Sequence, residues 1–257
     1  MNRILFDAMI FCWISLSVTV CAFAQSDTTR TADPADPTRI FVRITGPSGS
    51  VHMDGWEVNG ARQGVWKDYF PDTKLHTLVE YRNGKMDGIR VTLNNRAELA
   101  AEEHYRNGEQ HGLNRAFAKG GNIRLEQNYA FGKLEGNRKV YYDDGSIQEE
   151  GNWKNNLRDG ITKWYYKKNK LAVEYFYKNG NLEGEAKFFY ESGAKQKQVL
   201  FRNNLEEGEI LEFYENGKMK IRGMFKGGKK DGKWDTFDEN GKLVSSEKFK
   251  EGEPALK

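Results

Sequence analysis

Tyrosines at a regular spacing are the side chains of this sequence best placed for binding chemistry. Four of them recur at one constant interval, and two further aromatic residues flank them: Tyr142, Tyr166, Tyr190 and Tyr214, with Trp164 and Phe188. If each tyrosine lies on its own hairpin, neighbours stand two strands apart, about 9.6 Å, and the four rings span roughly 29 Å. Such a ladder could stack on a glycan chain or grip an extended peptide. Cross-strand packing in a thin sheet is the alternative role for the same rings.

Acidic side chains also recur, and their spacing favours turns over metal binding. One series precedes glycines that recur at the same interval: Asp87, Glu135, Asp159, Glu183, Glu207 and Asp231, with Gln63 and His111 completing it. No pair has the local spacing of a calcium loop, so turn chemistry and solubility are the expected roles. A second series is expected to form a solvated face beside lysines: Glu102, Glu126, Glu150 and Glu174.

The catalytic groups of the chain do not suggest an enzyme. The four histidines fall at different positions of the repeat, which predicts no metal cluster: His52, His76, His104 and His111. The sequence has neither a nucleophile elbow nor a phosphate loop. Carboxylates repeated in equivalent surroundings also lack the unlike environments that acid–base catalysis needs. We therefore expect a non-enzymatic protein with no catalytic residue, no metal and no cofactor.

The composition narrows the class of protein further. Of 257 residues, 38% are hydrophobic and 13% aromatic, with 40 Lys and Arg against 37 Asp and Glu, a net charge of +3. So many aromatic residues are not typical of disorder, while the low hydrophobic content disfavours a large conventional core. Because the charges nearly balance, we expect no nucleic-acid partner.

Residues 1–24 are typical of an export signal. An apolar run, Ala8–Val20, is followed by the small-x-small pattern Ala22–Ala24, which predicts cleavage after Ala24 and a mature chain from Gln25. An uncleaved anchor is the alternative, although the run is short for a membrane span. We expect a periplasmic or extracellular protein with no integral span after cleavage.

Both cysteines, Cys12 and Cys21, lie inside this predicted signal. The mature chain is therefore expected to contain no disulfide and no thiol nucleophile. Lipid attachment at Cys21 is not expected, because Val20 stands where a lipobox requires a small residue.

Residues 25–50 are predicted to form a flexible linker with a possible capping strand. Asp, Thr and Pro dominate as far as Thr38, a composition typical of a spacer. Ile40–Thr45 alternates weakly and is the candidate strand.

Residues 51–257 are a repeat domain of about eight units with a 24-residue period. The first glycine series is Gly60, Gly84, Gly108, Gly132, Gly180, Gly228 and Gly252, with Asn156 and Asn204 in the two vacant places. A second series has no exception: Gly64, Gly88, Gly112, Gly136, Gly160, Gly184, Gly208 and Gly232. An aromatic column has the same period: Tyr81, Tyr105, Tyr129, Trp153, Tyr177, Phe201, Phe225 and Phe249. Asn and Gly tolerate positive φ, so these series predict turns.

Each unit is predicted to be two strands joined by a turn. In one unit, Ile161–Tyr166 and Leu171–Tyr177 are aromatic and β-branched runs of strand length, and Asn179-Gly180 is a typical hairpin turn. Eight units give about 16 strands and a meander about 75 Å long. The predicted fold is all-β: an elongated, single-layer antiparallel β-meander of hairpin repeats, curved or twisted.

The repeat resembles the MORN-repeat family, and more closely its bacterial variant. The segments that carry the resemblance include Gly180–Gly193 and Gly228–Gly241, and it covers roughly residues 60–252. The 24-residue period is one residue longer than is usual in the classical repeat. Chains of this variant are often labelled YwqK-type antitoxins of toxin–antitoxin pairs. The resemblance implies a β-meander interaction module.

Three functions remain open from the sequence. The first is an exported protein-interaction or scaffolding surface with an unknown protein partner. The second is a cell-envelope polysaccharide binder that uses the aromatic ladder and its flanking residues. The third is an antitoxin-like inhibitor of a partner toxin.

Overall fold

The computed structural model describes residues 26–255. The predicted signal peptide and both cysteines lie outside the described residues. Within that range the chain is almost entirely β-structure, with a single 3-10 turn, η1, at Lys167–Asn169. No helix there is long and apolar enough to cross a membrane.

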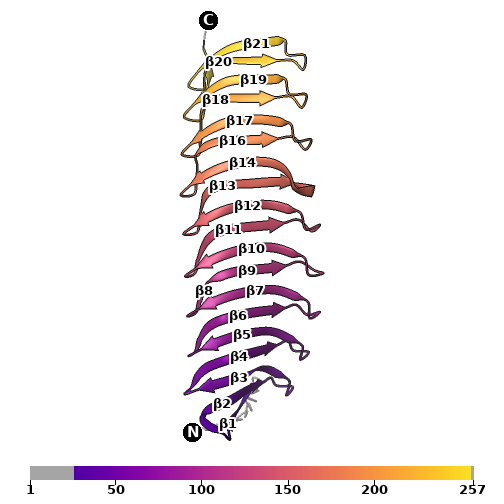
Figure 1. Ribbon diagram of the computed structural model, residues 1–257, viewed down its shortest axis with the longest axis vertical. Helices are drawn as coiled ribbons and strands as arrows, with labels where there is room; N and C mark the ends of the chain where they lie inside the picture. The colour runs from indigo at the N-terminus through magenta and orange to yellow at the C-terminus, as the bar shows by residue number, and fades with distance from the viewer. Residues whose placement is uncertain (1–25, 256–257) are drawn as a thin grey trace, which may run out of the picture.

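Twenty-two strands form one open antiparallel sheet, in which each strand pairs with its neighbours in sequence (Figure 1). The N-terminal strands are β1 Asp27–Asp33, β2 Asp36–Thr45 and β3 Val51–Val58. Eight repeat hairpins follow: β4 Ala61–Tyr69 with β5 Leu75–Arg82, β6 Lys85–Leu93 with β7 Leu99–Arg106, β8 Glu109–Gln110 and β9 Gly112–Phe117 with β10 Ile123–Ala130, β11 Lys133–Tyr141 with β12 Ile147–Lys154, β13 Leu157–Tyr166 with β14 Lys170–Lys178, β15 Asn181–Leu182 and β16 Gly184–Phe189 with β17 Lys195–Arg202, β18 Leu205–Phe213 with β19 Met219–Lys226, and β20 Lys229–Phe237 with β21 Leu243–Lys250. The last strand is β22 Glu253–Pro254.

The predicted elongated single-layer meander is confirmed, and so are its eight hairpin units. The strands stack along the long axis of the molecule, with tight turns on one long edge and longer loops on the other (Figure 1). The strand count exceeds the expected 16 for two reasons. Three strands precede the repeats and one follows them, and two long strands are each divided in two, as β8 and β9 and as β15 and β16.

The tight turns join each repeat to the next through the backbone. Asn179 and Gly180 both have positive φ, 50° and 84°, which is the geometry of a type I′ turn. The Gly180 amide then donates to the carbonyl of Arg158, in β13 just after the preceding tight turn, at 2.8 Å. The same bond recurs at every unit, and Asn156 and Asn204, with φ of 68° and 67°, form it where glycine is missing. The 24-residue period of the first glycine series therefore reflects a recurring hydrogen bond whose donor residue must adopt positive φ.

The linker predicted for residues 25–38 is wrong, because residues 27–45 form a hairpin that opens the sheet. Strand β1 pairs with β2 from Asp27 opposite Thr45 to Ala32 opposite Ile40. At the turn, the Asp33 carboxylate accepts a hydrogen bond from the Ala35 amide at 3.0 Å. The threonines that suggested a spacer are β-branched residues that suit a strand. The expected capping strand lies within β2.

The sheet has two unlike faces because side chains alternate along each strand. The aromatic face is the one that carries the aromatic column from Tyr81 to Phe249, and it holds the main core. Four buried side chains of that core are Ala186, Val199, Ile210 and Trp234. The charged face carries the glutamate series described below. Since no second layer among the described residues covers either face, each is covered only by its own side chains.

Two tryptophans of the aromatic face depend on glycines in the adjacent strand. Trp66 lies across Gly55, and Trp234 lies across Gly223, so that a Cβ at either glycine would overlap an indole ring. Trp66 is only 3% exposed, and its indole nitrogen donates to the Trp56 carbonyl at 2.9 Å. The ring therefore cannot move aside without losing both its burial and this bond.

We predict that Gly55→Ala destabilises the protein by about 1–3 kcal/mol, the usual cost of adding a buried methyl group without space for it. Urea unfolding followed by circular dichroism measures the change. The matched control is Gly60→Asn, because Gly60 has a φ of 77° and open space around it, as suits the asparagines at positions 156 and 204. The control should change stability by less than about 0.5 kcal/mol. Equal losses in the two variants would show that the indole contact is unimportant.

Candidate functional site

The aromatic column forms a half-exposed stripe along the tight-turn side of the aromatic face, in which each ring alternates with an opposing side chain such as Leu182, Glu206 or Lys230. All eight members of the predicted column, from Tyr81 to Phe249, are neither fully buried nor fully exposed. Burial raises the pKa of the Tyr177 phenol above its usual range, and that of Tyr175 beside it. The stripe is therefore partly desolvated while its rings remain accessible.

Near the middle of the sheet, the stripe is widened by rings from the neighbouring columns. The Trp164 ring packs edge-on against Tyr175 with centroids 5.5 Å apart, and Tyr175 packs edge-on against Phe188 at the same distance. The Phe201 ring lies 6.1 Å from Tyr175. Trp164 and Phe188, which the sequence placed beside the tyrosine ladder, thus belong to this aromatic cluster.

The tyrosine ladder lies at the long-loop edge, just beyond the point where each strand's register shifts. Every ladder hydroxyl donates to a backbone carbonyl 23 residues later: Tyr142 to Tyr165 at 2.7 Å, Tyr166 to Phe189 at 3.1 Å, Tyr190 to Phe213 at 2.8 Å, and Tyr214 to Phe237 at 2.8 Å. The hydroxyls therefore tie consecutive repeats together. The rings keep an accessible side, since Tyr166 is 36% exposed.

One cavity adjoins the ladder and brings two of the candidate residues together. It has a volume of about 200 Å³, and Phe188 and Tyr190 line it with Lys197, Glu212 and Lys220. The Lys197 ammonium lies 5.5 Å from the centre of the Phe188 ring. Aromatic walls combined with hydrogen-bonding polar groups resemble the composition of small-ligand sites.

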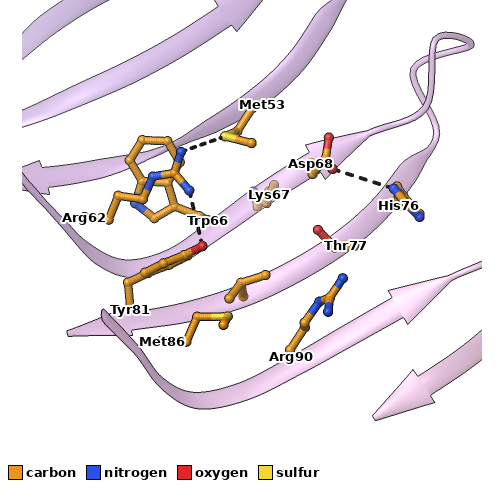
Figure 2. A pocket seen from close by; sticks show the side chains of 11 residues that line it. Met53, Arg62, Trp66, Lys67, Asp68, His76, Thr77, Tyr81, Met86 and Arg90 are labelled. Atoms are coloured by element: carbon orange, nitrogen blue, oxygen red, sulfur yellow. Dashed lines mark hydrogen bonds and ion pairs between the residues drawn. The ribbon is translucent and has the colours of Figure 1, made fainter. Parts of the chain in front are cut away.

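A second cavity lies on the aromatic face near the N-terminal end of the sheet (Figure 2), and the sequence interpretation missed it. Its volume is about 220 Å³. The Arg62 guanidinium lies over the Trp66 ring, 4.2 Å from its centre, and donates to the Tyr81 hydroxyl at 3.2 Å. Arg90 and Met86, from β6, lie at the other side of the cavity. A signal was present in the sequence, because Arg62, Arg158 and Lys230 share one position of the repeat.

The acidic series before the invariant glycines stabilises turns, as expected. A side-chain oxygen accepts a hydrogen bond from the backbone amide 20 residues later at Gln63, Glu135, Asp159, Glu183 and Glu207, over 2.8 to 3.1 Å. Each acceptor satisfies a donor of the next tight turn. Among residues 26–255, no three His, Cys, Asp or Glu side chains gather as metal ligands would.

On the charged face, acidic and basic side chains alternate from strand to strand and pair with one another. Directly opposed residues on consecutive strands run Glu102, Arg115, Glu126, Lys139, Glu150, Lys163, Glu174 and Lys187. Arg115 bridges two of the acids, reaching Glu126 at 3.0 Å and Glu102 at 3.7 Å. Opposed pairs of this kind contribute a few tenths of a kcal/mol to about 1 kcal/mol each.

Two tyrosines of the charged face reinforce this ladder. The Tyr141 hydroxyl donates to Glu126 at 2.7 Å, and the Tyr165 hydroxyl donates to Glu150 at 2.5 Å. Burial and, secondly, the bond to Glu126 raise the pKa of Tyr141 to about 12. The same bond, followed by the bond from Arg115, lowers the pKa of Glu126.

Comparison with known families finds a match in the C-terminal part of the repeat region. The family described as MORN repeat variant matches five segments, residues 134–155, 158–179, 182–203, 206–226 and 230–251. Each segment corresponds to one hairpin, such as β13 with β14. The hairpins before residue 134 lie outside these matches but repeat the same turn bonds. No curated protein matches the chain.

The tyrosine hydroxyls can be tested separately from the rings. Replacing Tyr166 and Tyr190 together by Phe removes two hydroxyl-to-carbonyl bonds, which should cost about 0.5–1.5 kcal/mol each in unfolding free energy. Replacing both by Ala should cost more, because the ring packing is lost as well. Urea unfolding measures both losses. If the double Phe variant were as stable as the parent chain, the hydroxyl bonds would not hold the repeats together.

The raised pKa of Tyr141, caused first by burial and secondly by its bond to Glu126, predicts a dependence of stability on alkaline pH. An unfolded tyrosine ionises near pH 10, whereas Tyr141 in the folded chain ionises near pH 12. The stabilisation is therefore complete below pH 10 and is lost as the pH rises through 12. Between these values the unfolding free energy should fall more steeply in the parent chain than in Tyr141→Phe. Parallel curves for the two proteins would contradict the assignment.

Proposed function

We propose that this chain is an exported, non-enzymatic binding protein whose aromatic face holds a protein partner. The observation that carries the proposal is the half-exposed aromatic stripe, repeated in all eight hairpins, on a sheet with no second layer among the described residues. MORN repeats are generally protein- or membrane-binding modules, which agrees with a binding surface. Aromatic side chains supply much of the energy at protein interfaces when a partner desolvates them.

The contrast between the two faces favours the aromatic one. On the charged face, acids and bases already oppose each other along the sheet, so a partner would have to displace these ion pairs. On the aromatic face, covering the partly exposed rings releases water. An elongated surface of this kind suits an extended segment that contacts several repeats in turn.

Export is part of this proposal and rests on the N-terminal sequence. The apolar run and the small-x-small pattern of residues 1–24 support cleavage after Ala24, without a lipid at Cys21. N-terminal sequencing of the chain from its source tests this part. Gln25 as the first residue is expected, whereas a cytoplasmic chain that retains Met1 would contradict export.

A charged, bulky substitution on each face tests the binding surface. Ala116 lies on the aromatic face opposite Leu125, while Asn137 lies on the charged face opposite Asn152. Immobilised residues 25–257 would be exposed to a cell-envelope extract of the source, and bound protein and glycan analysed separately. Ala116→Arg should reduce capture of the specific protein by about tenfold or more, as a hot-spot disruption does, while Asn137→Arg should change it little.

Two results would contradict the proposal. Equal loss in both variants would indicate a general charge effect, and loss only with Asn137→Arg would place the partner on the charged face. The identity of a captured protein would also decide whether the partner is a toxin, as the antitoxin hypothesis requires.

The cavity beside Phe188 and Tyr190 supports envelope polysaccharide as a second candidate ligand. Its aromatic walls and polar rim suit a sugar ring, and the ladder tyrosines recur at neighbouring repeats. Retention of the chain on purified envelope polysaccharide, with no protein enriched, would favour this function. Loss of retention in Tyr190→Ala, with an unchanged β-type circular dichroism spectrum, would assign the site.

A further inference from the structure

We propose that the cavity between Arg62 and Arg90 binds a carboxylate side chain of an extended polypeptide partner. This inference rests on the protein-binding function proposed above and names the chemistry of one contact. It concerns the part of the aromatic face formed by β3, β4, β5 and β6, away from the ladder cavity (Figure 2).

The cavity combines a cation with an apolar wall. Trp66, Val79 and Met86 contribute to its apolar lining, and Thr77 lies at its base with only 6% of its surface exposed. Its volume of about 220 Å³ is enough for one large side chain. The methylene groups of a glutamate could therefore lie against the wall with the carboxylate directed at Arg62.

Arg62 is held in place but retains free donors. Its guanidinium lies between two rings, 4.2 Å from the centre of Trp66 and 5.3 Å from that of Tyr81. One nitrogen donates to the Tyr81 hydroxyl at 3.2 Å and another contacts the Met53 sulfur at 3.3 Å. A guanidinium has five N–H donors, so three remain for a ligand. Because the rings fix its orientation, binding costs little side-chain entropy.

Within residues 26–255, Arg62 forms no ion pair. The acid directly opposite it, Glu57, is held by Arg30 at 2.7 Å. Of the other residues that line the cavity, Arg90 pairs with Glu103 at 3.1 Å, and the Asp68 carboxylate lies 3.6 Å from the His76 imidazole, which is charged only when it is protonated. The single guanidinium of Arg62 matches one carboxylate better than a doubly charged phosphate.

The chain contains its own comparison four repeats later. Arg158 occupies the position of Arg62 and lies over Trp153 and Trp164, 5.0 and 5.3 Å from their centres. There, Glu149 accepts a bond from the guanidinium at 2.6 Å. The position equivalent to Glu149, 96 residues earlier, is filled by Met53 in β3. The guanidinium of Arg158 is thus neutralised by Glu149, whereas that of Arg62 contacts only the thioether of Met53 at the equivalent position.

Binding of acetylated, amidated hexaglutamate to the full chain tests the proposal, with hexaglutamine as the neutral peptide. Calorimetry measures affinity, and the Trp66 indole resonance in NMR spectra reports whether the cavity is occupied. We expect hexaglutamate, but not hexaglutamine, to shift this resonance. Met53→Glu supplies the missing internal carboxylate and should weaken binding by about tenfold or more, the scale of one charge-assisted bond.

Two matched variants separate the pocket from general charge. Arg62→Gln should weaken binding as Met53→Glu does, whereas Arg222→Gln on the charged face makes the same change in net charge and should alter affinity less than about twofold. Asn137→Glu is the corresponding control for Met53→Glu. If Arg62→Gln fails to fold, Met53→Glu still tests the proposal, because this variant keeps Arg62 and its stacking on Trp66.

Three results would overturn the proposal. One is the absence of hexaglutamate binding at a peptide concentration of about 5 mM, because an affinity weaker than this could not support a specific contact. Another is equal binding by the parent chain and Met53→Glu. The third is Arg62-dependent binding of phosphatidylglycerol vesicles, or of free glutarate alone, without binding of the peptide. Capture of a protein partner by the aromatic face is measured in a separate experiment. The proposed protein-binding function and the proposed carboxylate site can therefore be contradicted independently.

Discussion

The hydrogen bond from each tight turn to the strand that follows the preceding tight turn sets the register on which the rest of the molecule depends. The Gly180 amide reaches the Arg158 carbonyl, and the same bond recurs at every unit. It requires positive φ at the donor, and so restricts that position to Gly or Asn. Once this bond fixes the register, equivalent side chains align in columns, and each column has one environment along the whole sheet.

Because the sheet has one layer, the side chains of each column can pair or pack only with neighbouring side chains of the same sheet. On the charged face, alternating signs and the tyrosines at 141 and 165 do this. On the aromatic face, the central core is buried, but the outer stripe stays half-exposed. A sum of such nearest-neighbour contacts stabilises an elongated molecule without a closed core. It also leaves the aromatic stripe available for a partner.

The period, the turns, the hairpins and the aromatic column could all be predicted from the sequence, because each recurs at a constant spacing. The hairpin β1–β2 could not, since its Thr-rich composition suits both a spacer and a strand, and only pairing with β2 decides. The roles of the ladder hydroxyls were also hidden. A bond from Tyr166 to the Phe189 carbonyl depends on where the register shifts at the strand end, and no local pattern reveals that. The Arg62 cavity was visible only by comparing one repeat position across units, where Met53 replaces the acid found at position 149.

Hydroxyl-radical footprinting of the free chain, read by mass spectrometry, tests most directly whether the aromatic face lies open. We expect oxidation along the whole aromatic column, for example at Tyr177 and Phe225, while Val199, 1% exposed on the same face, stays protected. Protection of the column as complete as that of Val199 would contradict an open face. That result would mean that another layer already covers the surface proposed for the partner.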